Sequence, residues 1–432
     1  MRVLVIGSGG REHALVDSIL RDKGTEVLCV PGNAGIAKQA EVVNIKVGDV
    51  PTLLHFVDEK KIDLTVVGPE VPLAAGIVDA FMGRGKAIFG PGKLAAQLET
   101  SKVFAKDFMK KWKIPTSDSK TFSVHETNEL KKYLEHSKYP VVIKADGLAA
   151  GKGVSIVQSF KEAEDEVEKF FVKKIFGESG ERLVVEEFMT GVEASVFAIT
   201  DGKDYVVLPP AQDHKRIGDN NTGKNTGGMG AFAPTPFMSQ AEMLVTQREV
   251  IEKVLEGTRA DGFPFCGCLY CGLMLTSEGP RVVEFNVRFG DPETQAVLQL
   301  VDSSVTDLLH ASATGKIGSY KLQLNDASAV CVIAASKGYP DEYQTGKVIT
   351  GLDEELENTK VFHSGSKNCD GECVTAGGRV LGAVGVDHGG SITRATKLAY
   401  DRLGKINFDG IYFRRDIAKN AIEFEKQNGK QK

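Results

Sequence analysis

The sequence lacks an apolar run long enough to span a membrane, and it lacks an excess of positive charge. Its 432 residues carry a net charge of −5, which disfavours a general nucleic-acid surface. The chain enters an apolar strand pattern directly after Met1, without the pattern of a secretory signal. These features predict a cytoplasmic protein of several domains that binds neither nucleic acid nor membrane.

Cysteine is also scarce. The chain has seven, an odd number, which fits reduced cytosolic thiols better than a disulfide framework. Cys266, Cys268 and Cys271 form a C-x-C-x-x-C pattern inside an apolar, strand-like run. Because alternate residues of a strand face opposite sides, and because the ligand spacing of known zinc sites is not matched, we expect buried thiols and no zinc.

The N-terminal glycine turn does not complete a dinucleotide fingerprint. An apolar strand at 3–6 is followed by G-S-G-G-R-E-H and a helical pattern, as at the start of a doubly wound sheet. Glu12 replaces the third glycine of G-x-G-x-x-G, and no ribose-binding acid follows the second strand at 27–30, so NAD is disfavoured. Two further strands, 64–67 and 87–89, also end at glycine turns. We expect a parallel sheet whose carboxyl edge binds a ligand; ordinary βα turns are the alternative.

A second glycine loop is not a P-loop, because Gly153 stands where that motif needs Ser or Thr. The run V-V-I-K-A-D-G-L-A-A-G-K-G-V begins as a buried strand that ends at Lys144, and Lys152 lies among the glycines that follow. Exposed backbone N–H groups and two ammonium groups suit a polyphosphate. A flexible hairpin tip with solvated lysines is the alternative.

The third pattern is a hairpin with acid and amide residues at its end. Glu284 and Asn286 are two apart on a predicted strand, so both should point to one face. Arg288, Asp291 and Glu293 follow closely. Hard oxygen ligands beside positive charge suit a phosphate-bound Mg²⁺. A salt-bridged hairpin end is the alternative.

Two lysines one helical turn apart form a further candidate. A helix is predicted from Lys102 to about Trp112, with Thr100 or Ser101 as its N-cap, and this helix brings Lys102 and Lys106 to one face. A solvated face is the alternative for both lysines. Farther along, the polar and glycine-rich segment 218–230 is expected to be mobile or ordered by a ligand.

The predicted fold class is α/β and α+β multidomain. We expect an N-terminal doubly wound parallel sheet in a substrate domain at 1–100. A central nucleotide-binding domain at 101–327 should contain a mobile lid subdomain at about 121–190, and a β-rich domain should occupy 328–432. The last of these shows no catalytic pattern.

Taken together, several motifs resemble the ATP-grasp ligases and, more closely, the glycinamide ribonucleotide synthetase family of purine synthesis. The stretches that carry the resemblance are V-I-G-S-G-G-R-E-H-A, P-G-N-A-G, V-G-P-E, I-K-A-D-G-L-A-A-G-K-G-V, Q-D-H-K-R, N-T-G-G-M-G-A and E-F-N-V-R-F-G-D-P-E-T-Q. They span nearly the whole chain in order. The resemblance implies an ATP-grasp fold for the central domain and a single activity.

The resemblance also implies roles for individual residues. ATP-binding roles fall on Lys102, Lys144, Gly147, Gly151, Lys152, Gly153, Glu186, Glu187, Phe188, Met189 and Glu193. Lys102 and Lys144 would reach the phosphates, residues 186–189 would hydrogen-bond adenine, and Glu193 would hold the ribose. The implied metal ligands are Glu284 and Asn286. Substrate-binding roles fall on Gly9, Gly10, Arg11, Glu12, Asn33, Glu70, Asp213, Lys215 and Arg288. The implied catalytic residues are Arg288, Lys144, Asp213 and Lys215.

The implied reaction joins glycine to 5-phosphoribosylamine through a glycyl phosphate, with ATP and Mg²⁺ (or Mn²⁺). It needs positioning and charge neutralisation more than a side-chain nucleophile. One departure from many ATP-grasp enzymes is that residues 272–275 contain no further acid, so a second metal ion is not assumed. Lys106 also competes with Lys102 for the first phosphate contact. Alternatives are another ATP-grasp ligase or carboxylase, a nucleotide-binding regulator without turnover, and a Rossmann oxidoreductase.

Overall fold

The N-terminal part of the chain forms a parallel sheet, as the glycine turns predict. The computed structural model describes residues 1–147, 153–175 and 177–429. The sheet has the order β3-β2-β1-β4-β5, with β1 (Arg2–Gly7), β2 (Glu26–Pro31), β3 (Glu41–Val42), β4 (Leu64–Val67) and β5 (Ile88–Phe89). Helices α1 (Gly10–Ile19), α2 (Val50–Lys60), α3 (Glu70–Ala75) and α4 (Ile77–Met82) connect these strands. Only the short β3 has no counterpart among the predicted strands.

The central strand β1 shows why this sheet is covered on both faces. Val3 and Val5 belong to one hydrophobic cluster, whereas Leu4 and Ile6 belong to another, and all four are fully buried. Alternate residues of a strand point to opposite faces, so each face of β1 packs into its own core. The strand order reverses next to β1, which is where open α/β sheets bind ligands.

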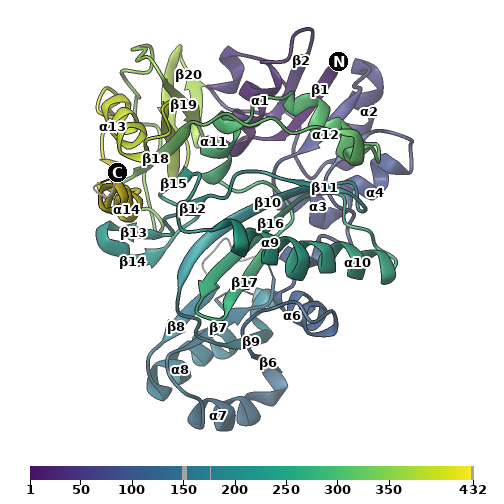
Figure 1. Ribbon diagram of the computed structural model, residues 1–432, viewed down its shortest axis with the longest axis vertical. Helices are drawn as coiled ribbons and strands as arrows, with labels where there is room; N and C mark the ends of the chain where they lie inside the picture. Colours follow the sequence, from purple (N-terminus) through teal and green to yellow (C-terminus); the bar gives the residue numbers. More distant parts are fainter. Residues whose placement is uncertain (148–152, 176, 430–432) are drawn as a thin grey trace.

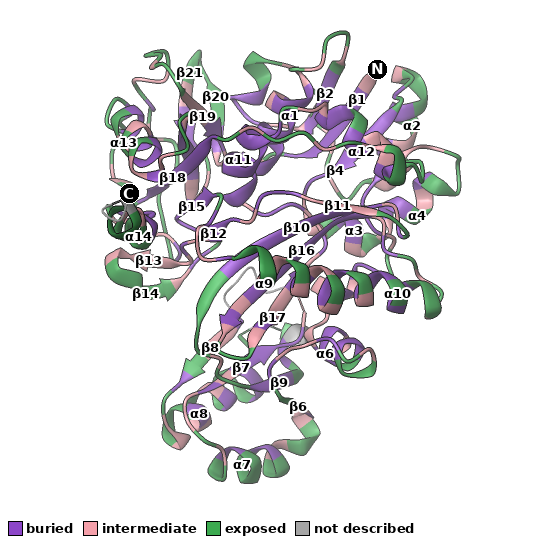
Figure 2. Cartoon of the chain, viewed as in Figure 1, coloured by how far each residue is buried: buried purple, intermediate pink, exposed green. Residues whose placement is uncertain are grey.

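The central sheet is antiparallel and contains the predicted hairpin. Its order is β11-β10-β16-β17, with β10 (Val192–Thr200), β11 (Tyr205–Val207), β16 (Gly267–Thr276) and β17 (Gly279–Asn286). The surrounding helices are α5 (Gln97–Thr100), α6 (Lys102–Lys111), α9 (Gln240–Thr246), α10 (Glu252–Ala260), α11 (Glu293–Val297) and α12 (Val305–Ala313). Figure 2 shows β10 and β16 buried along most of their length, with α10 exposed on its outer side.

A small subdomain, residues 119–187, lies at the lower end of the molecule in Figure 1. Its sheet has the order β6-β9-β7-β8, with β6 (Ser119–Ser123), β7 (Val141–Ala145), β8 (Val154–Val157) and β9 (Arg182–Glu187). Helices α7 (Thr127–Glu135) and α8 (Phe160–Val167) complete it. Its buried apolar side chains form a cluster drawn entirely from residues 122–185.

The C-terminal sheet reaches back across the predicted boundary at 327/328. Its order is β12-β15-β18-β22-β19, with β12 (Gln212–Asp213), β15 (Gly230–Ala233), β18 (Ser328–Ser336), β19 (Thr359–His363) and β22 (Arg379–Asp387); β23 (Ile411–Tyr412) pairs with β18. A separate hairpin of β20 (Ser366–Cys369) and β21 (Glu372–Thr375), with α13 (Ile392–Leu403) and α14 (Lys419–Gly429), accompanies this sheet. Two strands from the predicted central domain therefore belong to the C-terminal sheet.

The polar segment 218–230, which we expect to be mobile or ordered by a ligand, is partly paired in the structure. With the residues before it, the chain forms a hairpin of β13 (Arg216–Gly218) and β14 (Thr222–Asn225). Backbone pairing gives this polar stretch an ordered structure without an apolar face. The following residues then enter β15 and the C-terminal sheet.

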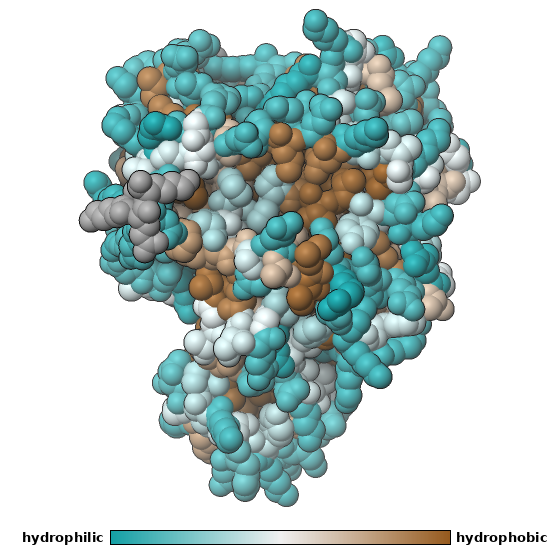
Figure 3. Space-filling view, viewed as in Figure 1, coloured by the Kyte–Doolittle hydropathy of each residue, from teal (hydrophilic) through white to brown (hydrophobic). Residues whose placement is uncertain are grey.

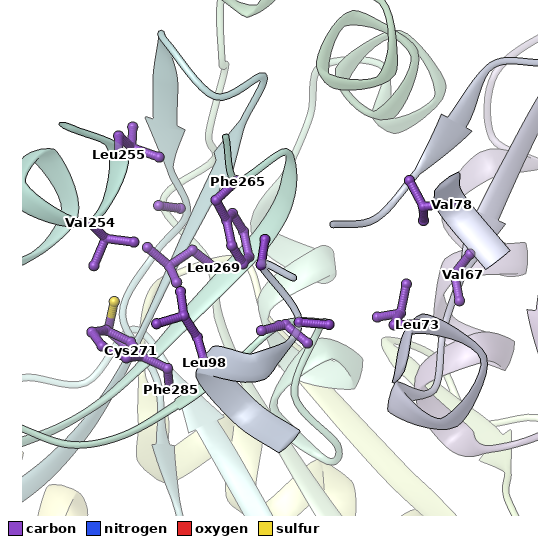
Figure 4. Close-up of a cluster of buried hydrophobic side chains, with 14 of the residues drawn as sticks. Val67, Leu73, Val78, Leu98, Val254, Leu255, Phe265, Leu269, Cys271 and Phe285 are labelled. Atoms are coloured by element: carbon purple, nitrogen blue, oxygen red, sulfur yellow. The ribbon is translucent and has the colours of Figure 1, made fainter. Parts of the chain in front are cut away.

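The larger part of the molecule is held together by cores that its domains share. One cluster contains Val3 of β1, Phe197 of β10 and Cys331 of β18, one from each major sheet. Another joins the N-terminal and central sheets, and Figure 4 shows part of it, including Val67 and Leu269. We call this shared-core part of the molecule the body. Its three sheets are positioned relative to one another by continuous packing.

The visible surface in Figure 3 is mostly hydrophilic on the small subdomain, whereas apolar atoms gather across the middle of the body. Within the described residues, no helix is long and apolar enough to cross a membrane. All seven cysteines are free thiols. Cys268 and Cys271 lie in different clusters on opposite faces of β16, so the C-x-C-x-x-C thiols do not converge. Burial raises the pKa of Cys266 to about 11.

Candidate active site

A buried group of two lysines and one glutamate lies where the small subdomain meets the body. Lys144 at the end of β7 and Glu186 on the neighbouring β9 form an ion pair of 3.0 Å between Nζ and Oε1. Lys106 of α6 pairs with the other oxygen of Glu186 at 3.1 Å. Lys144 also donates to the backbone oxygen of Val283 at 3.1 Å, which ties the small sheet to β17. All three charged side chains are at most 6% exposed.

The electrostatics of this group are those of a paired buried charge. Burial raises the pKa of Glu186, but Lys144 and then Lys106 outweigh burial and hold the pKa below its usual range. Burial lowers the pKa of Lys106 to about 8, although Glu186 opposes that shift. The solvated-face interpretation is therefore wrong for Lys106, whose ammonium is also held by Thr116 and Ser117.

Lys102 differs from Lys106 because it faces the glycine loop. Its Nζ donates to the backbone oxygen of Gly147 at 3.0 Å, at the point where that loop begins. Ser101 is the N-cap of α6, and its hydroxyl accepts from Phe104 N–H. Of the two competing lysines, Lys102 is the one at the loop. Gly151 and Lys152 lie outside the described residues.

Asp146 anchors the start of the same loop and was not among the predicted site residues. Its Oδ1 accepts from Ser101 Oγ at 2.9 Å and from Val103 N–H at 3.2 Å, and its other oxygen pairs with Arg182. Gly147 follows with φ +109°, a backbone conformation that favours glycine. At the far end, Gly153 accepts through its oxygen from Ala145 N–H at 2.8 Å. The K-A-D-G motif could have identified Asp146.

The predicted metal ligands lie on β17, beside a lysine from another segment. Lys215 Nζ is 3.5 Å from Glu284 Oε1 and 3.7 Å from Glu193 Oε2. Burial raises the pKa of Glu284, but Lys215, Lys144 and Lys102 outweigh it and bring the pKa to about 2. Asn286 is half-buried on the same strand. Glu284 is thus an ionised oxygen donor surrounded by cations, next to an amide oxygen on the same face. Across the described chain, no group of three or more His, Cys, Asp or Glu side chains is arranged to hold a metal.

Asp213 on β12 is half-buried, and one of its carboxyl oxygens is enclosed by the protein. Among the described residues, Asp213 Oδ1 has no hydrogen-bond partner. Burial and then Glu293 raise the pKa of Asp213 well above its usual range, although Lys215 opposes them. Glu293 itself accepts from Tyr270 Oη at 2.8 Å and from Ser195 Oγ at 3.2 Å. Tyr270 and Ser195 were missed from the sequence because nothing in their local pattern marks them.

Arg288, just beyond the hairpin, pairs with two acids from other segments. Its Nη2 is 2.8 Å from Glu99 Oε1, and its Nε is 3.5 Å from Glu70 Oε2. Burial raises the pKa of Glu99, although Arg288 opposes it. Glu99 also accepts from Val287 N–H at 2.7 Å. The N-terminal sheet edge, through Glu70, is thereby brought to the end of the β16–β17 hairpin. Glu99 was not predicted as a site residue.

At the first glycine turn, Glu12 lies inside the protein. It accepts from Gly9 N–H at 2.6 Å and pairs with Arg11 at 2.5 Å. A Cβ at Gly7 or Gly68 would lie within 2.4 Å of this side chain, so Glu12 fills the space between two strand ends. Arg11 also donates to Phe289 O at 3.0 Å. Through these contacts Arg11 and Glu12 stabilise the fold around the glycine turn. Their substrate-binding roles stay predictions.

Gly10 and Asn33 connect this edge to other parts of the body. A Cβ at Gly10 would lie 2.5 Å from Gln295, so glycine allows α1 and α11 to approach closely. Asn33 donates to Ser8 O at 2.8 Å and to His363 O at 2.7 Å, and its oxygen accepts from Gly35 and Ile36 N–H. Asn33 thus joins two glycine turns to β19. Its substrate role also stays a prediction.

The predicted adenine-binding segment follows Glu186. Glu187 is exposed, and its N–H donates to Asp118 O at 2.9 Å. Phe188 is 36% exposed and Met189 is half-buried. Glu193 begins the long strand β10 and is exposed. The segment therefore connects the small subdomain to the body beside the buried lysines.

Three parts of the chain, taken in order, match the three domain models of one protein family. Residues 1–99 match the N domain of phosphoribosylglycinamide synthetase, residues 100–294 its ATP-grasp (A) domain, and residues 329–420 its C domain. The chain is 47% identical to a phosphoribosylamine–glycine ligase of Caldanaerobacter subterraneus, over 97% of this chain and 99% of that protein. It is 45% identical to a protein of the same name from Clostridium acetobutylicum, over 97% of this chain and 100% of that protein.

A solved structure shows the same architecture. The crystal structure of a phosphoribosylamine–glycine ligase from Thermotoga maritima matches with a TM-score of 0.84 and 36% identity, covering 97% of this chain and 100% of that one. The three sheets described above are therefore those of a known three-domain arrangement, with an ATP-grasp domain in the centre.

Proposed function

This chain belongs to the phosphoribosylglycinamide synthetase family, and we propose that its site joins glycine to 5-phosphoribosylamine. It is an ATP-dependent ligase of the ATP-grasp class, acting in purine biosynthesis. The products would be glycinamide ribonucleotide, ADP and phosphate. The observation that carries the proposal is the convergence, at one junction, of Lys144, Glu284 and Arg288 from a chain that matches all three family domains.

The ATP end of the site is supported by the two lysines at the glycine loop. Lys102 contacts the backbone of Gly147, and Lys144 lies buried at the adjoining strand end. Their ammonium groups would neutralise phosphate charge, and the backbone of the loop would supply N–H donors. Residues 186–189 would hold adenine and Glu193 the ribose. Gly151 and Lys152 remain part of the proposal from the motif alone.

A divalent ion fits at Glu284 and Asn286, and we propose Mg²⁺ (or Mn²⁺). The low pKa of Glu284 keeps an ionised oxygen donor available, and the amide of Asn286 supplies a second oxygen on the same face. Mg²⁺ usually takes one or two protein oxygens and completes its sphere with phosphate and water. When bound, the ion would supply charge neutralisation between the phosphates. Lys215, which lies between Glu193 and Glu284, adds positive charge on the same side.

The acyl side of the site would be formed by Asp213, Lys215 and Arg288. Asp213 has an unused buried acceptor, which suits the ammonium group of glycine. The glycine carboxylate would attack the γ-phosphorus, forming a new O–P bond while the bond to ADP breaks. The amine of 5-phosphoribosylamine would then attack the carbonyl carbon, lose a proton and release phosphate. Arg288 would neutralise negative charge on the transferred phosphate or the acyl oxygen.

The N-terminal edge would hold 5-phosphoribosylamine. Gly9 and Gly10 lie at the start of α1, where a helix N-terminus favours an anion, and Glu70 reaches Arg288 from the same edge. Arg11, Glu12 and Asn33 would shape this edge from their present protein contacts. The seven free thiols support a cytoplasmic location. We propose domain boundaries near residues 100 and 327. Strands β12 and β15, which precede the second boundary, pair within the C-terminal sheet.

The test is ADP release by the purified protein with ATP, Mg²⁺ and glycine, with and without 5-phosphoribosylamine. We expect rapid release only when both substrates are present, together with a product containing glycine and ribose phosphate. Release that depends on bicarbonate or on another carboxylate, and not on glycine, would overturn the proposed substrates and leave the ATP-grasp class intact.

A further inference from the structure

Arg379 begins β22 in the C-terminal sheet and reaches into the junction described above. Its Nη1 donates to Gly227 O at 2.6 Å, to Gly228 O at 3.3 Å and to Asp291 O at 2.7 Å. The same nitrogen is 3.5 Å from Asp291 Oδ1. One guanidinium from the third domain therefore bridges two backbone segments that come from different parts of the central region.

The first of these segments is the turn at 226–229, which supports the residues after β12. Thr226 N–H donates to Lys215 O at 2.8 Å, and Met229 N–H donates to His214 O at 2.8 Å. A Cβ at Gly228 would lie 2.9 Å from Asp213 Oδ1, so this turn packs directly against the enclosed carboxyl oxygen. A shift of this turn would therefore move Asp213 and Lys215.

The second segment follows the metal hairpin and contains Asp291 between Arg288 and Glu293. Asp291 Oδ1 accepts from Gln295 Nε2 at 2.8 Å, and its Oδ2 accepts weakly from Arg11 N–H at 3.4 Å. This segment thus carries the guanidinium of Arg288 and contacts the start of α1. Arg379 links this segment to the turn over Asp213, and Pro292 also packs against Gly228 of that turn.

We propose that Arg379 is a positioning residue, which holds the Asp213–Lys215 side and the Arg288–Glu293 side of the site in fixed register. The inference rests on the proposed function, because it concerns the transfer of the glycyl group between those two sides. A transfer of this kind depends steeply on the separation of the reacting groups. Arg379 itself lies behind the turn and is assigned no contact with the substrates.

Arginine suits this place better than lysine does. The contacts given above are all made by Nη1, and the rigid, planar guanidinium keeps its charge and fixes the direction of that nitrogen toward carbonyl groups on two segments. Its charge also lies among the acids Asp213, Asp291 and Glu293. A lysine would preserve the charge but would offer a single ammonium on a flexible stem.

Arg402 provides a matched control in the same domain. It is a buried arginine of α13 that donates to two backbone oxygens, Gly351 O at 3.1 Å and Leu352 O at 2.9 Å. Those contacts lie within the C-terminal domain. The Arg402→Ala variant therefore measures how the loss of a buried arginine affects kinetics and melting temperature when its contacts do not join the two sides of the site.

The experiment compares Arg379→Ala, Arg379→Lys and Arg402→Ala with the parent enzyme. Measured quantities are kcat, the KM values for glycine and 5-phosphoribosylamine, the Kd for ATP and the melting temperature. We expect Arg379→Ala to lose about a hundredfold in kcat/KM for glycine, with the ATP Kd changed less than twofold. Guanidinium chloride at millimolar concentration should restore part of the rate to Arg379→Ala and none to Arg402→Ala. Arg379→Lys should remain impaired at unchanged melting temperature.

Two results would overturn the inference. One is an Arg379→Lys or Arg379→Ala enzyme with glycine kinetics within threefold of the parent. The other is an equal loss in Arg402→Ala, which would make the effect one of general stability. If Arg379→Ala does not fold, the comparison of Arg379→Lys with the parent decides alone. A parent enzyme without glycine-dependent ADP release would instead refute the proposed function.

Discussion

The small subdomain and the body differ in how their cores are built. The body has apolar clusters to which the N-terminal, central and C-terminal sheets all contribute, so no one of its domains can shift without disturbing the packing of another. The small subdomain keeps its apolar cluster to itself, within residues 122–185. A unit with its own core can move or open locally at a free energy below that of global unfolding.

The difference also divides the chemistry. The small subdomain carries the glycine loop and Lys144, which we assign to the ATP phosphates. The body carries Lys102 and Glu193, also assigned to ATP, together with the residues assigned to glycine, phosphoribosylamine and the metal. The two regions meet at the Lys144–Glu186–Lys106 group and at Val283. The proposed nucleotide site is thus shared between the independently packed unit and the body.

A cavity of about 510 Å³ separates the two regions on another side. From the small subdomain it is lined by the acids Glu162, Asp165 and Glu166 of α8, followed by Lys169. From the body it is lined by Arg216 and Lys224 of the β13–β14 hairpin and by Asp341, which pairs with Lys224 at 2.8 Å. Opposite charges across a gap favour its closing, by an amount that salt reduces.

We expect the largest effect from removing the charge of Glu186, whose carboxylate joins the small subdomain to the body. Glu186→Gln leaves Lys144 and Lys106 buried without their counter-charge, and we expect a loss of about 3–5 kcal/mol in the local stability of the small subdomain. Hydrogen exchange resolved by residue is the measurement. In the parent protein, amides at 119–187 should already exchange faster than those of the body and gain protection with ATP.

The control for that change is Glu168→Gln, which breaks an exposed pair with Lys173 on the same subdomain. It should alter exchange by less than about 0.5 kcal/mol. A Glu186→Gln protein whose small subdomain exchanges like the parent would show that the buried group does not hold the regions together.

The next largest effect should come from Lys144→Ala. Glu186 keeps its pair with Lys106, so the fold should persist while a charge-assisted phosphate contact is lost. Such a contact is worth about 1.5–3 kcal/mol, which predicts an ATP affinity lower by about tenfold to a hundredfold. Titration calorimetry measures it, with Lys161→Ala, an exposed lysine of α8, as the control. Equal ATP affinity in the two variants would remove Lys144 from the nucleotide site.

Glu284→Gln tests the body's side of the junction. It should raise the Mg²⁺ concentration needed for ADP release and weaken Mn²⁺ binding in the presence of ADP, which electron spin resonance can follow. Glu278→Gln at the exposed tip of the same hairpin is the control. A normal metal profile with a lowered melting temperature would mean that Glu284 is structural and that the ion binds elsewhere.

The pH dependence of stability at Glu284 has a definite sign. Its pKa of about 2 lies below the ordinary value of 4.5, so the folded protein favours the ionised form. The stabilisation is complete above about pH 4.5 and disappears as the pH falls toward 2. Melting temperatures of the parent should therefore fall more steeply with acid than those of Glu284→Gln. Parallel curves would contradict the depressed pKa.

We expect the smallest effect from a charge at the cavity between the small subdomain and the body. Lys224→Ala removes one positive charge on the body's side of the cavity, where Lys224 pairs with Asp341, and should weaken ATP binding by about 0.2–1 kcal/mol at low salt and by nothing measurable at high salt. Lys397→Ala, an exposed lysine of α13, is the control. An effect of the same size at both salt concentrations would point to packing and not to attraction across the gap.

Local patterns in the sequence were sufficient for the parts that depend on neighbours along the chain. Val3–Ile6 with its glycine turn and the hairpin that carries Glu284 and Asn286 follow from periodicity and turn chemistry, and the N-cap of α6 was narrowed to Thr100 or Ser101. The order of the motifs identified the family. In each case the deciding residues lie within a few positions of one another.

Only the tertiary structure decided the contacts between distant segments. The sequence placed Glu186 in the predicted adenine-binding segment 186–189, yet its carboxylate is buried between Lys106 and Lys144. These lysines are 80 and 42 positions away in the chain. Strands β12 and β15 pair within the C-terminal sheet. Arg379 contacts the proposed site although the sequence of its own domain shows no catalytic pattern. A one-dimensional pattern records which faces are apolar, but the choice among possible partners depends on packing and charge compensation in three dimensions, which involve the whole chain at once.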